Sequence, residues 1–459
     1  MKKMLIISLI ILLILPSISI QGKQIHESFE KFSETPESHL IEGVPYVGQD
    51  INFHCNLACF TMILKYNKIN SSLNEVIYNS CNGYSHYYIN QDEYRVPIPG
   101  SCKSILPSNY KFLSELYGLS YEPWISDVNV TFEDRWANDW VRIKENITSD
   151  IPVMVELDVK ILLIEYLGFK STYDFKKIIG PPKSHYVVLV GYNESNNTVC
   201  YNDPQYLILD KPELGTYRWS DLTTFKNAIS RLSIEIWPSD YLIKIFRVNN
   251  TPLSKEDAFR LAYSKSIERL KGNSSGYITE YDYEVIGDYL EEDYPHEYGI
   301  NGSKKLREHF SKGINNRIKT IMTYKKQGKF GMKNRLNSFI DLIYTKFHPK
   351  KSFLDFVILG FANLYDYVSL DEQYAISYLK DAVNSLNDKN LTALCRYEIE
   401  LFERESENWT KLSGYYSEFM KKGFFMSLPR GILLMNKMEE TMDNIIAIEE
   451  AIIAGMWEE

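Results

Sequence analysis

A cysteine stands at the point where loop-like sequence gives way to a helical pattern. After Cys55, residues that suit one helix face recur at i, i+3, i+4, i+7 spacing: Leu57, Phe60, Thr61 and Leu64. Cys55 is therefore expected at or just before a helix N-terminus, where unsatisfied backbone N–H groups and the helix dipole favour a thiolate. A thiolate is a nucleophile suited to acyl transfer. The alternative is a structural cysteine that is buried on an apolar helix.

Gln49 offers the hydrogen-bond donor that such a reaction needs. It precedes Cys55 by six positions (55 − 49 = 6), in the polar stretch before the predicted helix. Attack of a thiolate on a carbonyl group places negative charge on the carbonyl oxygen, and a preorganised N–H group stabilises that charge. We therefore expect the Gln49 side-chain amide to point at an oxyanion formed beside the sulfur.

A candidate base and a group that orients it lie in a predicted hairpin. The buried strand 184–192 begins with a histidine at its second position, a polar turn follows at 193–197, and a second strand ends before Asp203. The hairpin brings His185 and Asp203 to the same edge, although they are 18 positions apart (203 − 185 = 18). An imidazole that a carboxylate holds is a suitable base for a cysteine nucleophile. The alternative is a structural histidine.

Four stretches, in this order along the chain, resemble the C39-like peptidase family of papain-like cysteine enzymes. They are Val44–Val47 leading into Gln49 and Cys55, the strand 151–155, the segment from His185 through Asp203 to Pro204, and Tyr217–Ser220 before Leu222 and Phe225. The resemblance covers roughly residues 41–245. It implies an α+β papain-like cysteine-protease fold, in which the N-terminal helix bearing the cysteine packs on an antiparallel sheet. The roles that it implies are Cys55 as nucleophile, His185 as base, Asp203 as the residue that orients the base, and Gln49 as oxyanion donor.

Two features depart from the C39-like pattern. Members of that family usually have Gly-Pro after the nucleophile, where this chain has Asn56 and Leu57. A long insertion, 161–183, separates the central strand from His185, and its apolar start suits a lid, a partner surface or a short packed helix. His54-Cys55 and the run Val155–Asp158, which the insertion follows, are similar to a sister group, the butirosin-biosynthesis H-type acyltransferases. That group uses the same kind of site to move an acyl group.

The chain is long enough for two domains, because 459 residues exceed what one hydrophobic core usually holds. We expect a C39-like domain at 41–248 and an all-helical domain at 252–459, which makes few contacts with the Cys55 pocket. One helix of the second domain should begin at Ser254 and end at Gly272. Further helices are expected at 353–367, from Ser369 to Val383, and at 433–456. In the first domain, Trp136 and Trp140 on one helix face should line a cleft or pack in the core.

The N-terminus has the pattern of a targeting segment. Lys2 and Lys3 precede an apolar run that Pro16 interrupts, so residues 1–21 are expected to be a signal peptide or an N-terminal anchor. Residues 22–40 read as a linker. Both interpretations place the body of the protein outside the cytoplasm, secreted or at the cell surface. Ten N-x-S/T sequons suit a glycoprotein there: Asn70, Asn129, Asn146, Asn193, Asn196, Asn249, Asn273, Asn301, Asn390 and Asn408.

Cysteine usage, motifs and charge restrict the chemistry further. Outside the cytosol disulfides are permitted, and Cys81 and Cys102, which flank one loop, are favoured as a pair. No HExxH or paired CxxC spacing occurs in the sequence, so no metal and no other cofactor is expected. The net charge of −9 argues against nucleic acid or an anionic membrane surface as the main partner.

Three functions are compatible with these residues. The favoured one is a secreted or surface cysteine hydrolase, a C39-like peptidase that acts on a peptide, amide or thioester through a Cys-His-Asp triad and a thioester intermediate. The second is an acyltransferase of the butirosin H type with an amine acceptor. The third is a non-catalytic C39-like binding module. In each case the helical domain is assigned to binding or scaffolding, with an unidentified protein partner.

Overall fold

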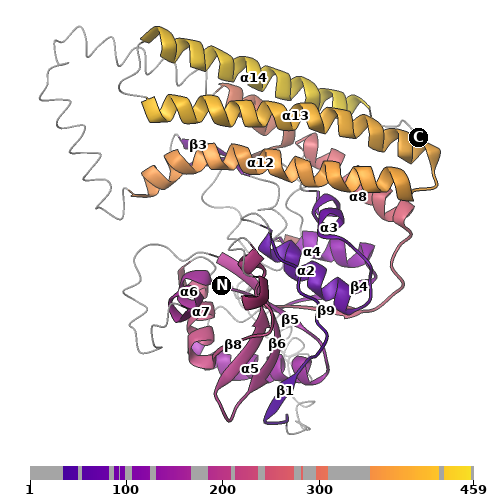
Figure 1. Cartoon of the computed structure of the whole chain (residues 1–459), viewed down its shortest axis with the longest axis vertical. Coiled ribbons are helices and arrows are strands. Elements are labelled where there is room, and N and C mark those ends of the chain that lie inside the picture. Colours follow the sequence, from indigo (N-terminus) through magenta and orange to yellow (C-terminus); the bar gives the residue numbers. More distant parts are fainter. Residues whose placement is uncertain are drawn as a thin grey trace, which may run out of the picture. The chain divides into compact units, whose positions relative to one another are not determined.

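An antiparallel sheet forms the framework of the N-terminal half and carries His185 (Figure 1). The computed structural model describes residues 35–49, 54–81, 87–91, 94–98, 106–124, 131–166, 184–207, 212–235, 243–272, 281–282, 296–308, 352–422 and 428–455. Within these ranges the sheet runs in the order β4 (Leu119–Trp124), β9 (Ile243–Val248), β5 (Val153–Asp158), β6 (Ser184–Asn193), β7 (Thr198–Asn202) and β8 (Arg218–Asp221), and β1 (Ser38–Leu40) pairs with the end of β6. Every one of these pairs is antiparallel.

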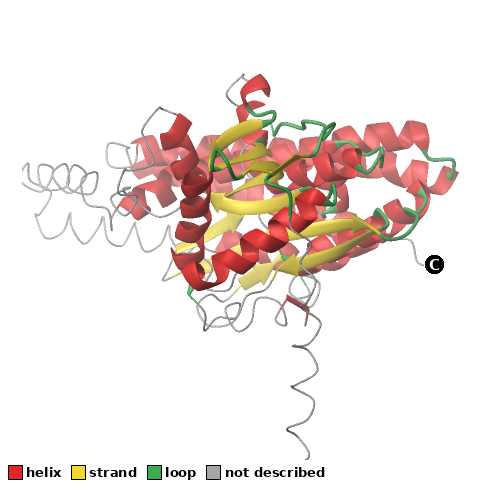
Figure 2. Cartoon of the chain, turned by 90° about the horizontal axis from the view of Figure 1, so that it is seen from below, coloured by secondary structure: helices red, strands yellow, loops and turns green. Residues whose placement is uncertain are grey.

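The central strands of this sheet are buried on both faces. All six residues of β5 are buried, and β6 is buried from His185 to Tyr192. A strand that is buried on both faces has few polar residues, because neither face meets solvent. Helix α7 (Leu222–Glu235) packs on β5, and Figure 2 shows helices lying across the strands. The predicted hairpin is present as β6 and β7, which are paired from Val188↔Asn202 to Asn193↔Thr198.

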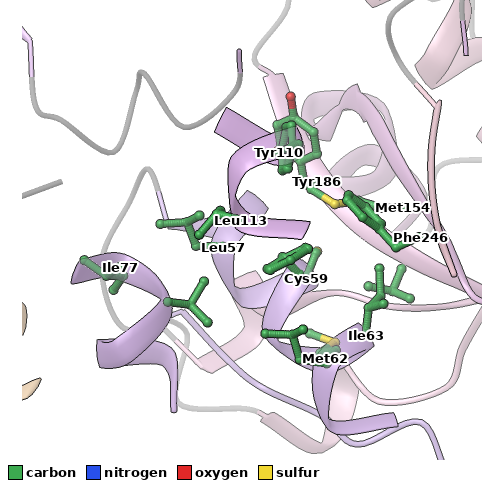
Figure 3. Packing of buried hydrophobic residues seen from close by; sticks show 14 of the residues in the cluster. Leu57, Cys59, Met62, Ile63, Ile77, Tyr110, Leu113, Met154, Tyr186 and Phe246 are labelled. Atoms are coloured by element: carbon green, nitrogen blue, oxygen red, sulfur yellow. The ribbon is translucent and has the colours of Figure 1, made fainter. Parts of the chain in front are cut away.

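Helix α2 (Cys55–Tyr66) begins at the cysteine, as predicted, but it is buried on all sides rather than on one face. Every residue from Asn56 to Leu64 is buried. The helix lies between β6 and the short helix α3 (Leu73–Asn79), so that no face is left for solvent. Figure 3 shows Leu57, Met62 and Ile63 of α2 in the same cluster as residues of α3, α4 (Pro107–Leu116), β5 and β9.

Two segments of this half whose role the sequence left open, the helix with Trp136 and Trp140 and the start of the insertion, are packed helices. In α5 (Phe132–Thr148), Trp136 and Trp140 are buried and stacked with their ring centroids 5.9 Å apart, so they belong to the core and not to an open cleft. The start of the insertion forms α6 (Val159–Tyr166), where Ile161 and Leu162 are buried and the helix packs on α7. Residues 167–183 lie outside the described part of the chain.

The first helix after the sheet has the predicted ends. Helix α8 (Lys255–Leu270) is capped by the Ser254 hydroxyl, which accepts a hydrogen bond from the Asp257 amide at 3.1 Å. It stops before Gly272, which has a φ of +81°. A φ in this left-handed region suits glycine, and an added Cβ would also come within 2.6 Å of Asn301. Three long helices follow, α12 (Ser352–Ser385), α13 (Lys389–Lys422) and α14 (Leu428–Ala454), which lie side by side (Figure 1).

Two expectations for the C-terminal half are wrong. Ser369 does not begin a new helix, because α12 runs through it without a break. Its hydroxyl bonds across to α13, at 2.7 Å from Ser406 Oγ and 2.9 Å from Thr410 Oγ1, so its polar group is satisfied inside the helix pair. This half is also not helical throughout, since β10 (His296–Tyr298) pairs with β2 (Tyr87–Gln91), which pairs with β3 (Tyr94–Ile98). A three-residue strand is too short to show alternation in the sequence.

Residues 38–459 form one compact unit. The boundary that the sequence predicts near residue 250 falls in the connection between β9 and α8. A single cluster of buried apolar residues nevertheless contains Leu57 of α2, Phe259 of α8 and Ala375 of α12. Among the described residues, no helix is both long and apolar enough to cross a membrane.

Candidate active site

The first turn of α2 exposes one thiol and buries another. Cys55 is the first residue of the helix and is partly exposed, whereas Cys59, one turn further on, is fully buried. Burial raises the pKa of Cys59 well above its usual value, and the nearby Cys55 and Asp203 add to this rise. Figure 3 shows Cys59 within the apolar cluster. Of these two cysteines, only Cys55 is placed to react with a substrate.

The hairpin brings His185 and Asp203 together as the sequence predicts. His185 is the second residue of β6, and Asp203 follows the last residue of β7. His185 Nε2 lies 2.7 Å from Asp203 Oδ1, and both residues are 3% exposed. The same Asp203 oxygen accepts the Gln205 amide at 2.9 Å, and the Asp203 amide donates to the Gly215 carbonyl at 2.8 Å. The turn around Asp203 therefore fixes the Asp203 carboxylate, and this carboxylate fixes the His185 imidazole.

Cys55 lies close enough to His185 to raise the pKa of the imidazole. Because Nε2 of the imidazole faces Asp203, Nδ1 is the ring nitrogen that remains for the sulfur. Burial alone would lower the pKa of His185. The charge of Asp203, the hydrogen bonds to Asp203 and Cys55 and the charge of Cys55 oppose burial, and together they raise the pKa from 6.5 to about 10. The imidazole is therefore protonated at neutral pH, between a sulfur and a carboxylate.

Gln49 lies against the turn that follows Asp203. Its backbone amide donates to the Pro204 carbonyl at 2.9 Å, and its side chain is buried. Tyr46 supports the same turn, since its hydroxyl donates to the Asp203 carbonyl at 3.1 Å. The Gln49 Oε1 atom accepts no hydrogen bond from the described residues. Residues 50–53, which connect Gln49 to the residue before α2, lie outside those residues.

The structure thus joins Cys55, His185 and Asp203 in one row and places Gln49 beside the turn at its end. Comparison with known proteins gives a family for this part of the chain. Residues 41–229 match the model of the Peptidase_C39 like family. The four predicted site residues all lie inside this C39-like region, and the resemblance that the sequence suggested is confirmed there. No curated protein matches the chain. The likeness to butirosin H-type acyltransferases stays a prediction.

The other cysteines of the described part are buried. Burial raises the pKa of Cys200, in β7 of the C39-like region, to about 12. Burial, together with the charge of Glu398, does the same for Cys395 in α13. Cys81 is buried after α3, and Cys102 lies outside the described residues, so the pairing of Cys81 with Cys102 stays a prediction.

The sequence analysis missed a buried polar cluster next to the site. Lys244 Nζ in β9 lies 3.6 Å from Glu156 Oε2 in β5 and 5.6 Å from the centre of the Tyr110 ring. Burial lowers the pKa of Lys244 from 10.5 to about 8, although Glu156 opposes the effect. Burial and the charge of Glu156 raise the pKa of Tyr110 well above its usual value, and the nearby Asn56, the residue that follows Cys55, opposes the rise. The available signal was a charged residue inside each of two apolar strands, at 156 and 244.

A second missed contact comes from the C-terminal helices. His54, directly before Cys55, lies 2.7 Å from Asp371 of α12, in the region for which the sequence predicts few contacts with the Cys55 pocket. No sequence pattern marks this pair, since 317 positions separate its members. Among the described residues, no group of three or more His, Cys, Asp or Glu side chains is arranged to hold a metal ion.

Proposed function

We propose that the chain is a cysteine peptidase in which Cys55 is the nucleophile, His185 the general acid and base, and Asp203 the residue that orients the imidazole. The observation that carries the proposal is the row itself, a partly exposed thiol beside an imidazole whose far nitrogen is held 2.7 Å from a buried carboxylate. The match of residues 41–229 to a peptidase-like family supports the same reaction class. The packing of α2 on β6 supports a papain-like arrangement.

In the first half of the reaction, Cys55 Sγ attacks the carbonyl carbon of the scissile peptide bond. The carbonyl oxygen becomes an oxyanion, and the Gln49 side-chain amide and the Cys55 backbone N–H donate hydrogen bonds to it. When the tetrahedral intermediate collapses, the C–N bond breaks and His185 transfers its proton to the departing nitrogen. The amine product leaves neutral, the acyl group stays on Cys55 as a thioester, and His185 is now neutral.

In the second half, water replaces the amine. His185 removes a proton from a water molecule whose oxygen attacks the thioester carbon, and the C–S bond then breaks. The carboxylic acid product leaves, and the sulfur returns as a thiolate beside a protonated imidazole. Asp203 holds the ring throughout and stabilises its positive charge. This cycle needs no metal or organic cofactor.

We place this reaction outside the cytoplasm, as the targeting pattern of residues 1–21 and the ten sequons favour. The substrates that the partly exposed thiol of Cys55 can reach are then the peptides and proteins of that compartment. A signal peptide that is removed and an N-terminal anchor that stays both fit this assignment. Edman sequencing of the mature protein distinguishes them, because removal gives a new N-terminus close to residue 21.

The proposal is tested by measuring new amino termini. Full-length protein and its Cys55→Ala variant are incubated with unfolded casein and with a mixed peptide library, and released amines are measured by fluorescamine and mass spectrometry. The wild type should produce new termini and the variant should not. Equal release by both would show that Cys55 is not the nucleophile. If an added amine receives the acyl group and no free acid forms, the reaction is acyl transfer and not hydrolysis.

A further inference from the structure

The C-terminal helices contact the residue that comes directly before the nucleophile. His54 is fully buried, and its Nε2 atom lies 2.7 Å from Asp371 Oδ1 in α12. Asp371 is also buried, at 1% exposed, so the pair is shielded from solvent. Tyr374, one turn further along α12, packs edge-on against the His54 ring with the centroids 4.9 Å apart and an angle of 81° between the planes. Two side chains of α12 thus fix the position of this ring.

His54 holds the start of α2 through its backbone only. It is the N-cap residue, and its carbonyl oxygen accepts the Ala58 amide at 2.9 Å. An N-cap side chain often accepts a hydrogen bond from an amide of the first turn. The His54 side chain makes no such bond. Instead the ring turns away to Asp371. The residue that begins α2 is therefore bound to the helix by its main chain and to α12 by its side chain, and Cys55 comes next.

Other contacts keep α12 in place independently of this pair. Asn74 Nδ2 of α3 donates to Ser377 Oγ at 2.9 Å, and Tyr78 of the same helix donates to Glu398 of α13 at 3.1 Å. The rings of Tyr78 and Tyr378 also pack with their centroids 4.9 Å apart. Loss of the hydrogen bond between His54 and Asp371 therefore leaves α12 attached to α3. Its effect should be local to the start of α2.

We propose that Asp371 is a positioning residue for the nucleophile. Through His54 it sets where Cys55 Sγ lies relative to His185, so the C-terminal helical region completes the candidate active site. The inference rests on the proposed function, because it assigns Asp371 a part in the reactivity of Cys55. A purely structural pair would contribute to the stability of the fold and leave the chemistry of Cys55 unchanged. The two roles are separable because a displaced nucleophile loses rate while the protein stays folded.

The test measures the alkylation rate of Cys55 in full-length protein. Iodoacetamide is added at about pH 6, and modification of the Cys55 peptide is followed by mass spectrometry. Asp371→Ala removes the acceptor and should slow this rate about 10- to 100-fold. Asp371→Asn keeps an acceptor oxygen and should restore the rate to within about threefold of the wild type. Asn74→Ala is the matched control, since it breaks an α3–α12 hydrogen bond that does not involve His54, and it should leave the rate unchanged.

Each outcome decides between the two roles. With any substrate found, Asp371→Ala should lower kcat more than it changes KM. Wild-type alkylation in a folded Asp371→Ala variant that melts at a lower temperature would overturn the inference and leave a structural role. If Asp371→Ala does not fold, Asp371→Leu fills the space without an acceptor, and failure of both to fold would also establish the structural role. Unreactive Cys55 in the wild type would instead contradict the proposed function.

Discussion

Replacing Asp203 by asparagine tests the pairing of Asp203 with His185 through the pH dependence of stability. The two side chains are buried 2.7 Å apart, and the pKa of His185 rises from 6.5 to about 10 because the Asp203 and Cys55 contributions outweigh burial. A group whose pKa is raised by folding adds stability that is fully present below its unfolded pKa, here 6.5. That stability is lost as the pH rises through the folded value of about 10.

The size of the effect follows from these two pKa values. The raised pKa of His185 contributes about 5 kcal/mol to the free energy of unfolding at pH 6 and about 1 kcal/mol at pH 9. Asp203→Asn keeps an oxygen for the hydrogen bond but removes the charge, so burial should then dominate and the contribution should disappear. The free energy of unfolding should therefore differ between wild type and variant by about 3–4 kcal/mol more at pH 6 than at pH 9.

Urea unfolding followed by tryptophan fluorescence at the two pH values measures this difference. Asp158→Asn is the matched control, because Asp158 is buried and pairs with Arg231 at 2.6 Å. Arginine does not titrate in this range, so the control variant should lose the same stability at pH 6 and pH 9. If Asp203→Asn also loses the same amount at both values, His185 is not held as an imidazolium by Asp203 and the reasoning is refuted.

Three further predictions concern the thiols, the oxyanion donor and the core. At about pH 6, iodoacetamide should label Cys55 well ahead of Cys59, whose pKa is raised by burial, and peptide mapping that finds equal labelling would contradict the assignment. Gln49→Ala should lower kcat about 100-fold or more with little change in KM, and an unchanged kcat would remove Gln49 from the oxyanion site. Phe60→Ala should lower the free energy of unfolding by about 3–5 kcal/mol, because the fully buried ring packs 5.0 Å from Phe246, and a loss under 1 kcal/mol in urea unfolding would count against this packing.

The sequence predicted the parts of the site that depend on local patterns. A polar stretch before an apolar helical run placed Cys55 at the start of α2, and two strands around a short turn placed His185 opposite Asp203. Both predictions rest on interactions within about 20 residues, where periodicity and turn chemistry determine the geometry. The same local logic found the Ser254 cap of α8.

The sequence did not predict features that depend on distant partners. The capping pattern at Ser369 is present, but α13 offers that hydroxyl the partners Ser406 and Thr410, and the helix continues. The contact between His54 and Asp371 spans 317 positions, and one sequence carries no sign of it. Burial of α2 on all sides likewise follows from packing between elements and not from its own pattern.

The central claim is that Cys55 is the nucleophile of an acyl-transfer site, and acylation by an activated ester tests it most directly. Full-length protein is mixed with p-nitrophenyl acetate, the release of p-nitrophenol is followed, and acid-quenched protein is mapped by mass spectrometry. We predict a burst of about one equivalent, an acetyl group on the peptide that contains Cys55, a slower burst in His185→Ala and none in Cys55→Ala. An acetyl group on another residue, or a burst that persists in Cys55→Ala, would contradict the claim.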